Sequence, residues 1–128
     1  MKITLLSLLI LITANCFAAN WKMVNENPMG TSYIDVDTIS KHNNRVYFWR
    51  LLDYPNPSPI GVYSSVSEFN VDCVSEKITW LSSAYFSKSM GMGKIIKEGT
   101  FNRTLYPRPD SAEFEMMKFA CNFRQLNT

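Results

Sequence analysis

The sequence predicts an α+β domain in which a small antiparallel β-sheet has a C-terminal helix packed on one face. Over most of the chain the apolar residues recur with a period of two, which is typical of strands. The segments between these runs are short enough for hairpins, so neighbouring strands are expected to run antiparallel. Only the last segment changes to helical spacing. A length of 128 residues allows a single domain.

The chain begins with the pattern of a signal peptide. Met1-Lys2 provides a positive start, the apolar run Ile3–Ile12 follows, and small residues lead to a cleavage site after Ala18. The apolar run is shorter than the roughly 20 residues that cross a bilayer. We therefore expect residues 1–18 to be removed and residues 19–128 to form one exported domain with no transmembrane span.

Two cysteines, Cys73 and Cys121, remain in the mature chain. Exported compartments are oxidising, so an even pair predicts a disulfide, with two buried free thiols as the alternative. The third cysteine, Cys16, lies in the signal segment and is the alternative site of lipidation. A lipidated cysteine normally follows Gly or Ala, whereas Asn15 precedes this one. We therefore predict a periplasmic or cell-surface protein without a lipid anchor.

The first elements of the mature chain are short. Residues 21–24 predict a strand, residues 25–30 a polar turn and residues 33–36 a second strand. Asp37 is a good cap for one helical turn. The pair 43–44 is Asn-Asn, which tolerates the left-handed conformation of a tight hairpin.

The strongest strand candidate is the segment 45–54. Its apolar residues occupy both alternating faces, which is typical of a central strand covered on both sides in its middle. Three prolines in residues 55–59 then predict a stiff, exposed loop, because proline cannot lie in a central strand.

Two alternating strands follow at 61–74 and 78–86. The alternation of the first places Cys73 on its buried face. Strict alternation in the second assigns Ile78, Trp80, Ala84 and Phe86 to the buried face, and Lys77, Thr79 and Ser83 to the opposite one. Residues 90–93 predict a flexible Met-Gly loop, and residues 94–101 a weaker edge strand.

The last element is predicted to be a helix. Residues 110–113 have the form of a capping sequence. Phe114, Met117 and Cys121 then recur on one helical face. Because Cys73 lies on an apolar sheet face and Cys121 on an apolar helix face, a helix laid across the sheet and tied to it by a disulfide satisfies both patterns.

Composition and motifs argue against several classes of function. The formal net charge of +2, with no strong Lys/Arg cluster, is too small for a nucleic-acid binder. The single histidine, His42, rules out metal sites and triads that need a second one. Asp35 and Asp37 are a candidate cation pair, but turn and cap chemistry explains them better. The acid, base and nucleophile sets of an active site are missing, so we expect no enzyme, no metal and no cofactor.

Several short motifs keep a fixed order along the mature chain. They are Trp21, Tyr33-Ile-Asp35, Thr38-Ile39, Val46-Tyr-Phe-Trp49, Leu52-Asp53-Tyr54, Ser65, Glu68-Phe-Asn-Val-Asp72-Cys73, Tyr85, Met90-Gly91, Pro109, Ser111 and Cys121. In order and spacing they resemble the surface-adhesin protein E family of exported bacterial proteins. The resemblance implies a fold in which a disulfide joins an antiparallel sheet to a C-terminal helix, and adhesion to host extracellular-matrix components. Residues 97–105 match in position only.

We therefore expect a non-enzymatic, exported, adhesin-like binding protein whose partner is a protein or glycan outside the cytoplasm. The alternative is a periplasmic structural or inhibitory module that binds another bacterial protein by its sheet. A homodimer is compatible with both functions.

Two exposed regions are candidates for partner binding. One is the proline loop at 55–59, whose rigidity lowers the entropy lost on binding. The other is a basic segment formed by Lys88, Lys94, Lys97 and Arg103, with Glu98 as its single acid. Such a segment would attract acidic matrix proteins or sulfated glycans. The alternative is that the lysines only protect an exposed edge strand from aggregation.

Overall fold

The structure is a computed structural model that describes residues 19–124. The predicted signal peptide and Cys16 lie outside the described residues. The elements are β1 (Trp21–Asn27), β2 (Gly30–Asp35), β3 (Ser40–His42), β4 (Arg45–Asp53), β5 (Ser64–Asp72), β6 (Lys77–Phe86), the short 3₁₀ helix η1 (Ser89–Gly91), β7 (Ile95–Leu105) and α1 (Ala112–Asn122).

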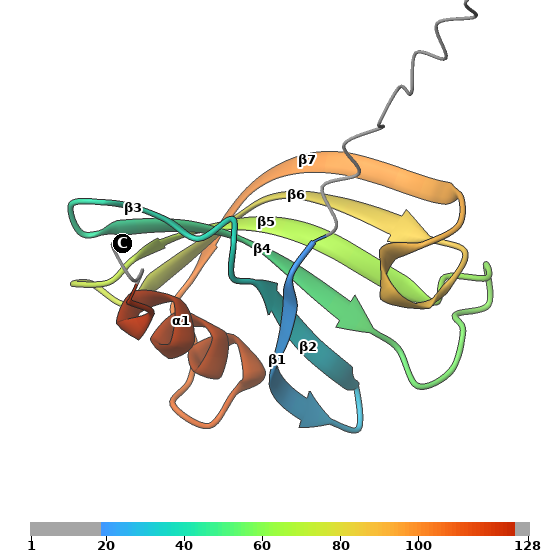
Figure 1. The fold of residues 1–128 in the computed structure, drawn as a ribbon, viewed down its shortest axis with the longest axis horizontal. Helices are drawn as coiled ribbons and strands as arrows, with labels where there is room; N and C mark the ends of the chain where they lie inside the picture. Colours follow the sequence, from blue (N-terminus) through green and yellow to red (C-terminus); the bar gives the residue numbers. More distant parts are fainter. Residues whose placement is uncertain (1–18, 125–128) are drawn as a thin grey trace, which may run out of the picture.

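The strands form one antiparallel sheet in the order β1-β2-β4-β5-β6-β7, with β3 paired to β4. Figure 1 shows β4 to β7 arching over α1, which lies beside β1 on the concave side of the sheet. The predicted fold class, an antiparallel sheet with a C-terminal helix on one face, is therefore confirmed.

The hydrophobic core lies between α1 and the concave side of the sheet. Its buried members are Ile34, Ile39, Val46, Phe48, Phe69, Val71, Ile78, Met116, Met117 and Ala120. The rings of Phe48 and Phe69 stack at its centre, with centroids 5.7 Å apart. Burying a side chain of this size contributes about 1.5–3 kcal/mol, so these strands supply much of the stability of a small domain.

The helix α1 begins where the sequence predicts. Ser111 is its N-cap, and the hydroxyl of Ser111 accepts a hydrogen bond from the backbone N–H of Phe114 at 3.2 Å. The disulfide Cys73–Cys121 joins the residue after β5 to the last turn of α1, which confirms the predicted pairing. The helix therefore cannot leave the sheet without strain on this bond.

Two short N-terminal features differ from the prediction. Residues 25–27, expected in a turn, extend β1 and pair with β2, so that only Pro28 and Met29 remain between the strands. The helical turn expected after Asp37 is absent, because the Asp35 carboxylate accepts the Asp37 N–H at 3.1 Å and holds a non-helical turn. The unpredicted strand β3 then pairs with β4 through a hairpin in which Asn43 has a φ of 57°, as expected for this pair.

The strand β4 lies in the middle of the sheet, as predicted, but it is not covered on both sides in its middle. Phe48 faces α1 and is buried, whereas Trp49 on the opposite face is 36% exposed. Leu51, on the same side as Trp49, is buried because η1 folds back over it, as Figure 1 shows at the end of the sheet away from α1. The helix α1 therefore covers one face of β4 near Phe48, and η1 covers the other face near Leu51.

A β-bulge in β6 overturns the predicted alternation of that strand. The register shifts between Trp80 and Ser82, where β6 meets β5 and β7. The extra residue moves Ser83 to the same face as Trp80, and it moves Ala84 and Phe86 to the opposite face. This shift brings polar side chains onto the concave side of the sheet.

Candidate functional site

The helix α1 leaves part of the concave side of the sheet uncovered, and we call this part the open face. Residues paired across neighbouring strands point to the same side of a sheet, so the pairing defines the open face as three rows. The rows are Phe48, Phe69, Trp80 and Arg103; Arg50, Ser67, Ser83 and Gly99; and Leu52, Ser65, Tyr85 and Lys97. The first row is the border of the open face, because Phe48 and Phe69 are buried in the core. The open face thus combines aromatic rings, hydroxyl groups and three cationic side chains.

A network of hydroxyl groups holds the centre of the open face. The Ser67 and Ser83 hydroxyls are hydrogen-bonded to each other at 2.5 Å, and both side chains are buried. The indole N–H of Trp80 donates to the Ser83 hydroxyl at 2.8 Å. Because a buried hydroxyl is costly without a partner, this network fixes the orientation of the Trp80 ring. The outer face of that ring stacks on Phe101 of β7, with centroids 4.2 Å apart.

The cavity on the helix side of the open face holds two arginines and one carboxylate. It has a volume of about 230 Å³ and is lined by Arg50, Phe69, Trp80, Arg103, Leu105 and Glu113. The Arg50 guanidinium lies over the Phe69 ring, 4.9 Å from its centroid. Burial lowers the pKa of Arg50, and the carboxylate of Glu113 in the first turn of α1 partly offsets this effect.

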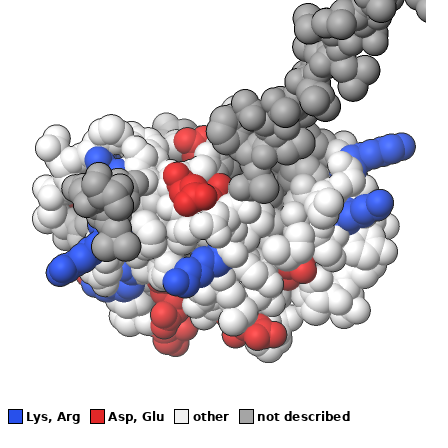
Figure 2. Space-filling view, viewed as in Figure 1, with Lys and Arg blue, Asp and Glu red and all other residues white. Residues whose placement is uncertain are grey.

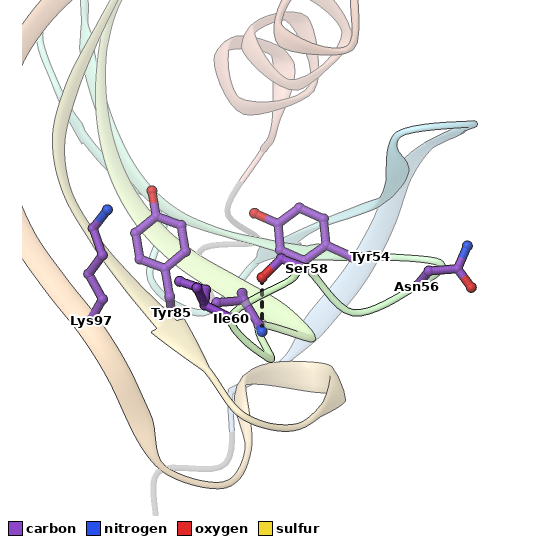
Figure 3. A pocket seen from close by; sticks show the side chains of 7 residues that line it. Tyr54, Asn56, Ser58, Ile60, Tyr85 and Lys97 are labelled. Atoms are coloured by element: carbon purple, nitrogen blue, oxygen red, sulfur yellow. Dashed lines mark hydrogen bonds between the residues drawn. The ribbon is translucent and has the colours of Figure 1, made fainter.

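The cavity on the loop side lies between the open face and the proline loop. It has a volume of about 330 Å³ and is lined by Tyr54, Asn56, Ser58, Ile60, Val62, Tyr85 and Lys97. Figure 3 shows the two tyrosine rings with Ile60 between them, and Asn56 directed away from the other side chains. The Lys97 ammonium group lies 5.6 Å from the centroid of the Tyr85 ring. These walls suit an apolar group that carries a negative charge.

The proline loop keeps its shape through its own hydrogen bonds. The Ser58 hydroxyl accepts from the backbone N–H of Val62 at 3.1 Å, drawn as the dashed line in Figure 3. The Tyr54 hydroxyl donates to Ser65 on the open face at 3.2 Å. The loop is therefore attached to the sheet as one wall of a cavity, and its three prolines remain exposed as predicted.

The four predicted basic residues lie in two parts of the fold. Lys97 and Arg103 project from β7 onto the open face, but they line different cavities. Lys88 and Lys94 lie in the connection between β6 and β7, next to η1. On the side of the molecule in Figure 2, basic and acidic side chains are interspersed and do not gather into one patch. The strand β7 is nevertheless an exposed edge strand, as the sequence predicts.

Two features of the open face were not predicted from the sequence. The apolar pattern of the segment 45–54 does not single out Arg50, although its position two residues after Phe48 places it on the core-facing side. The predicted alternation puts Ser83 on the face opposite Trp80, so it does not predict the hydrogen-bonded pair of Ser67 and Ser83. A charged residue in phase with buried residues of a central strand is the signal that could have identified Arg50.

The described residues offer little else that is chemically unusual. No group of three or more His, Cys, Asp or Glu side chains among them could hold a metal ion. Backbone N–H groups of Ser75 and Val74 donate to the Asp72 carboxylate, and they lower the pKa of Asp72, with the Ser75 contribution the larger. Within residues 19–124 we find no helix with the length and apolar character of a membrane span.

Comparison with known proteins identifies related sequences and folds. The profile of the surface-adhesin protein E family matches residues 21–122. Crystal form II of Haemophilus influenzae protein E has a similar fold, with a TM-score of 0.62 at 20% identity over 79% of this chain and 86% of that one. Protein E from non-typeable Haemophilus influenzae gives a TM-score of 0.56 at 18% identity, over 77% of this chain and 74% of that one. No curated protein sequence matches this chain significantly.

Proposed function

The chain belongs to the surface-adhesin protein E family, and from this premise we propose that it is an exported adhesin that binds host matrix macromolecules without catalysing a reaction. The observation that carries this proposal is the open face. It places Arg50, Lys97 and Arg103 beside aromatic rings on a side of the sheet that α1 leaves uncovered. Aromatic and arginine side chains are the residue types that dominate binding energy at interfaces.

The charge of the open face supports an acidic partner. Three cationic groups line its two cavities, against the single carboxylate of Glu113. Attraction between complementary charges raises the rate of association, and salt weakens this attraction. The exposed edge of β7, which carries Lys97 and Arg103, lies next to both cavities and adds backbone groups that a partner strand can reach.

The test compares two double variants with the same change of charge. Lys97→Gln with Arg103→Gln alters the open face, whereas Lys88→Gln with Lys94→Gln alters the β6–β7 connection outside it. Binding of the mature protein to immobilised host matrix glycoproteins is measured at low and at physiological salt. We expect the first pair to weaken binding several-fold and the second to leave it nearly unchanged. Equal effects of both pairs would mean that the open face is not the binding surface.

The location of the protein is part of the same proposal. We propose that residues 1–18 are removed on export, that Cys16 carries no lipid, and that the domain is displayed at the cell surface. Intact mass of the purified protein tests cleavage and lipidation. Protease treatment of intact cells tests display: digestion of the domain supports an adhesin, and full protection supports the alternative.

The alternative function is a periplasmic module that binds another bacterial protein by its sheet. The observation in its favour is β7, an edge strand of 11 residues that pairs with β6 alone among the described strands. Such an edge can accept a strand from another protein. Lys97 and Arg103 on β7 are also consistent with protection against unwanted pairing. The two double variants distinguish this role, because loss of a purely protective charge leaves binding unchanged and increases aggregation.

A further inference from the structure

Arg50 is a cation in the sheet without an acid partner. Its Nε atom is buried and has no hydrogen-bond partner among residues 19–124, and no carboxylate within that range lies close enough to form an ion pair with it. Its guanidinium lies over the Phe69 ring, and the Glu113 carboxylate compensates its charge only from beyond ion-pair distance. A covered guanidinium N–H without an acceptor is costly, because it has lost water and gained nothing equivalent. The natural acceptor is a group that enters from outside.

The cavity around Arg50 carries more positive than negative side chains, which favours an anionic ligand. Arg103 lines the same space from β7, and Glu113 lines it from α1 without reaching ion-pair distance of either arginine. Two guanidinium groups against one carboxylate leave a positive site. Guanidinium is also the side-chain group whose planar donors match an oxyanion with two parallel hydrogen bonds.

The size and walls of the cavity restrict the ligand. A volume of about 230 Å³ is below the usual range of sites for whole small molecules, roughly 300–1,000 Å³. The cavity therefore suits one side chain of a larger partner. Phe69, Trp80 and Leu105 supply apolar walls, which fit the methylene stem of an acidic side chain better than the hydroxyl groups of a sugar.

We propose that this cavity binds a carboxylate side chain of a protein partner between Arg50 and Arg103. The inference rests on the proposed function, since it specifies the chemical group by which that partner is recognised. Glu113 competes with the incoming carboxylate for the same two cations, so it weakens binding and makes the affinity sensitive to its charge.

Propionate is the probe, because it is a carboxylate on a two-carbon stem like the side chain of glutamate. The mature protein is titrated with propionate at constant ionic strength, and the Arg50 Nε–H signal is followed by ¹⁵N–¹H NMR. We expect a saturable shift. Arg103→Gln, an exposed position where folding is not at risk, should weaken binding about tenfold, as expected for loss of a charged hydrogen-bond partner. Glu113→Gln should strengthen it, and Lys94→Gln, outside the cavity, should leave it unchanged.

The same titration with sulfate separates the two kinds of oxyanion. Tighter binding of sulfate than of propionate would overturn the proposal in favour of a sulfated glycan. A shift that does not saturate, or equal effects of Arg103→Gln and Lys94→Gln, would also overturn it. No matrix protein is present in this experiment. If propionate does not bind at Arg50, the carboxylate site is wrong but the proposed function is untouched. If propionate binds but the protein does not bind matrix glycoproteins, the proposed function is wrong and the carboxylate site stands.

Discussion

Replacement of both Cys73 and Cys121 by alanine should destabilise the domain strongly while preserving its strands. The disulfide closes a segment with a sequence separation of 48 residues. The chain-entropy treatment of a loop of that length gives about 4 kcal/mol of stabilisation, lost when the unfolded chain is no longer constrained. Because α1 also buries Met116, Met117 and Ala120, the helix should remain docked in the double variant at low denaturant. We therefore expect a loss of about 2–4 kcal/mol without a change of fold.

The assay is urea unfolding followed by far-UV and near-UV circular dichroism. Wild type, the double variant and wild type with reductant are compared, and the free energy of unfolding is extrapolated to water for each. The double variant and the reduced protein should agree, since both lack the same constraint. A loss below about 1 kcal/mol in both would refute the reasoning, because it would show that the unfolded chain is not constrained by this bond. Loss of the far-UV signal of the double variant without denaturant would instead refute the expectation that packing keeps α1 docked when the disulfide is absent.

Three further variants test the packing and the turns. Gly30→Ala should cost more than about 1 kcal/mol in urea unfolding, because the new Cβ would lie 2.5 Å from a backbone carbonyl oxygen of β4; the control Gly61→Ala shares the strain of a positive φ, here 81°, but meets nothing within 4 Å and should cost less. Phe48→Ala should lower the free energy of unfolding by about 3–5 kcal/mol, and Trp49→Ala, on the half-exposed face, by clearly less; equal losses would contradict the assigned faces. Asp72→Asn should cost stability fully above the ordinary carboxyl pKa of 3.8 and progressively less as pH falls through the lower folded pKa; a cost that does not decrease below pH 3.8 would exclude this linkage.

The sequence identified two of the three cationic residues of the open face, but not how they are arranged. Lys97 and Arg103 were identified as candidate binding residues from a simple excess of positive charge. Their separation into two cavities follows from the pairing of β7 with β6. Arg50, which the charge count along the chain did not single out, lines the same cavity as Arg103, although β5 and β6 lie between their strands. Sequence spacing carries no information about such neighbours.

Local patterns by themselves determined the strands β4 to β7 and the start of α1 at Ser111, because each depends on side chains that are close in the chain. The pairing of Cys73 with Cys121 followed from an even number of cysteines in an exported chain. Only the tertiary structure decided how much of that face α1 covers and where the β6 bulge lies. A bulge adds one residue to one strand of a pair, and this single residue reverses the face of every later side chain. That reversal placed Ser83 and Tyr85 on the open face, and long-range packing rather than local pattern fixed it.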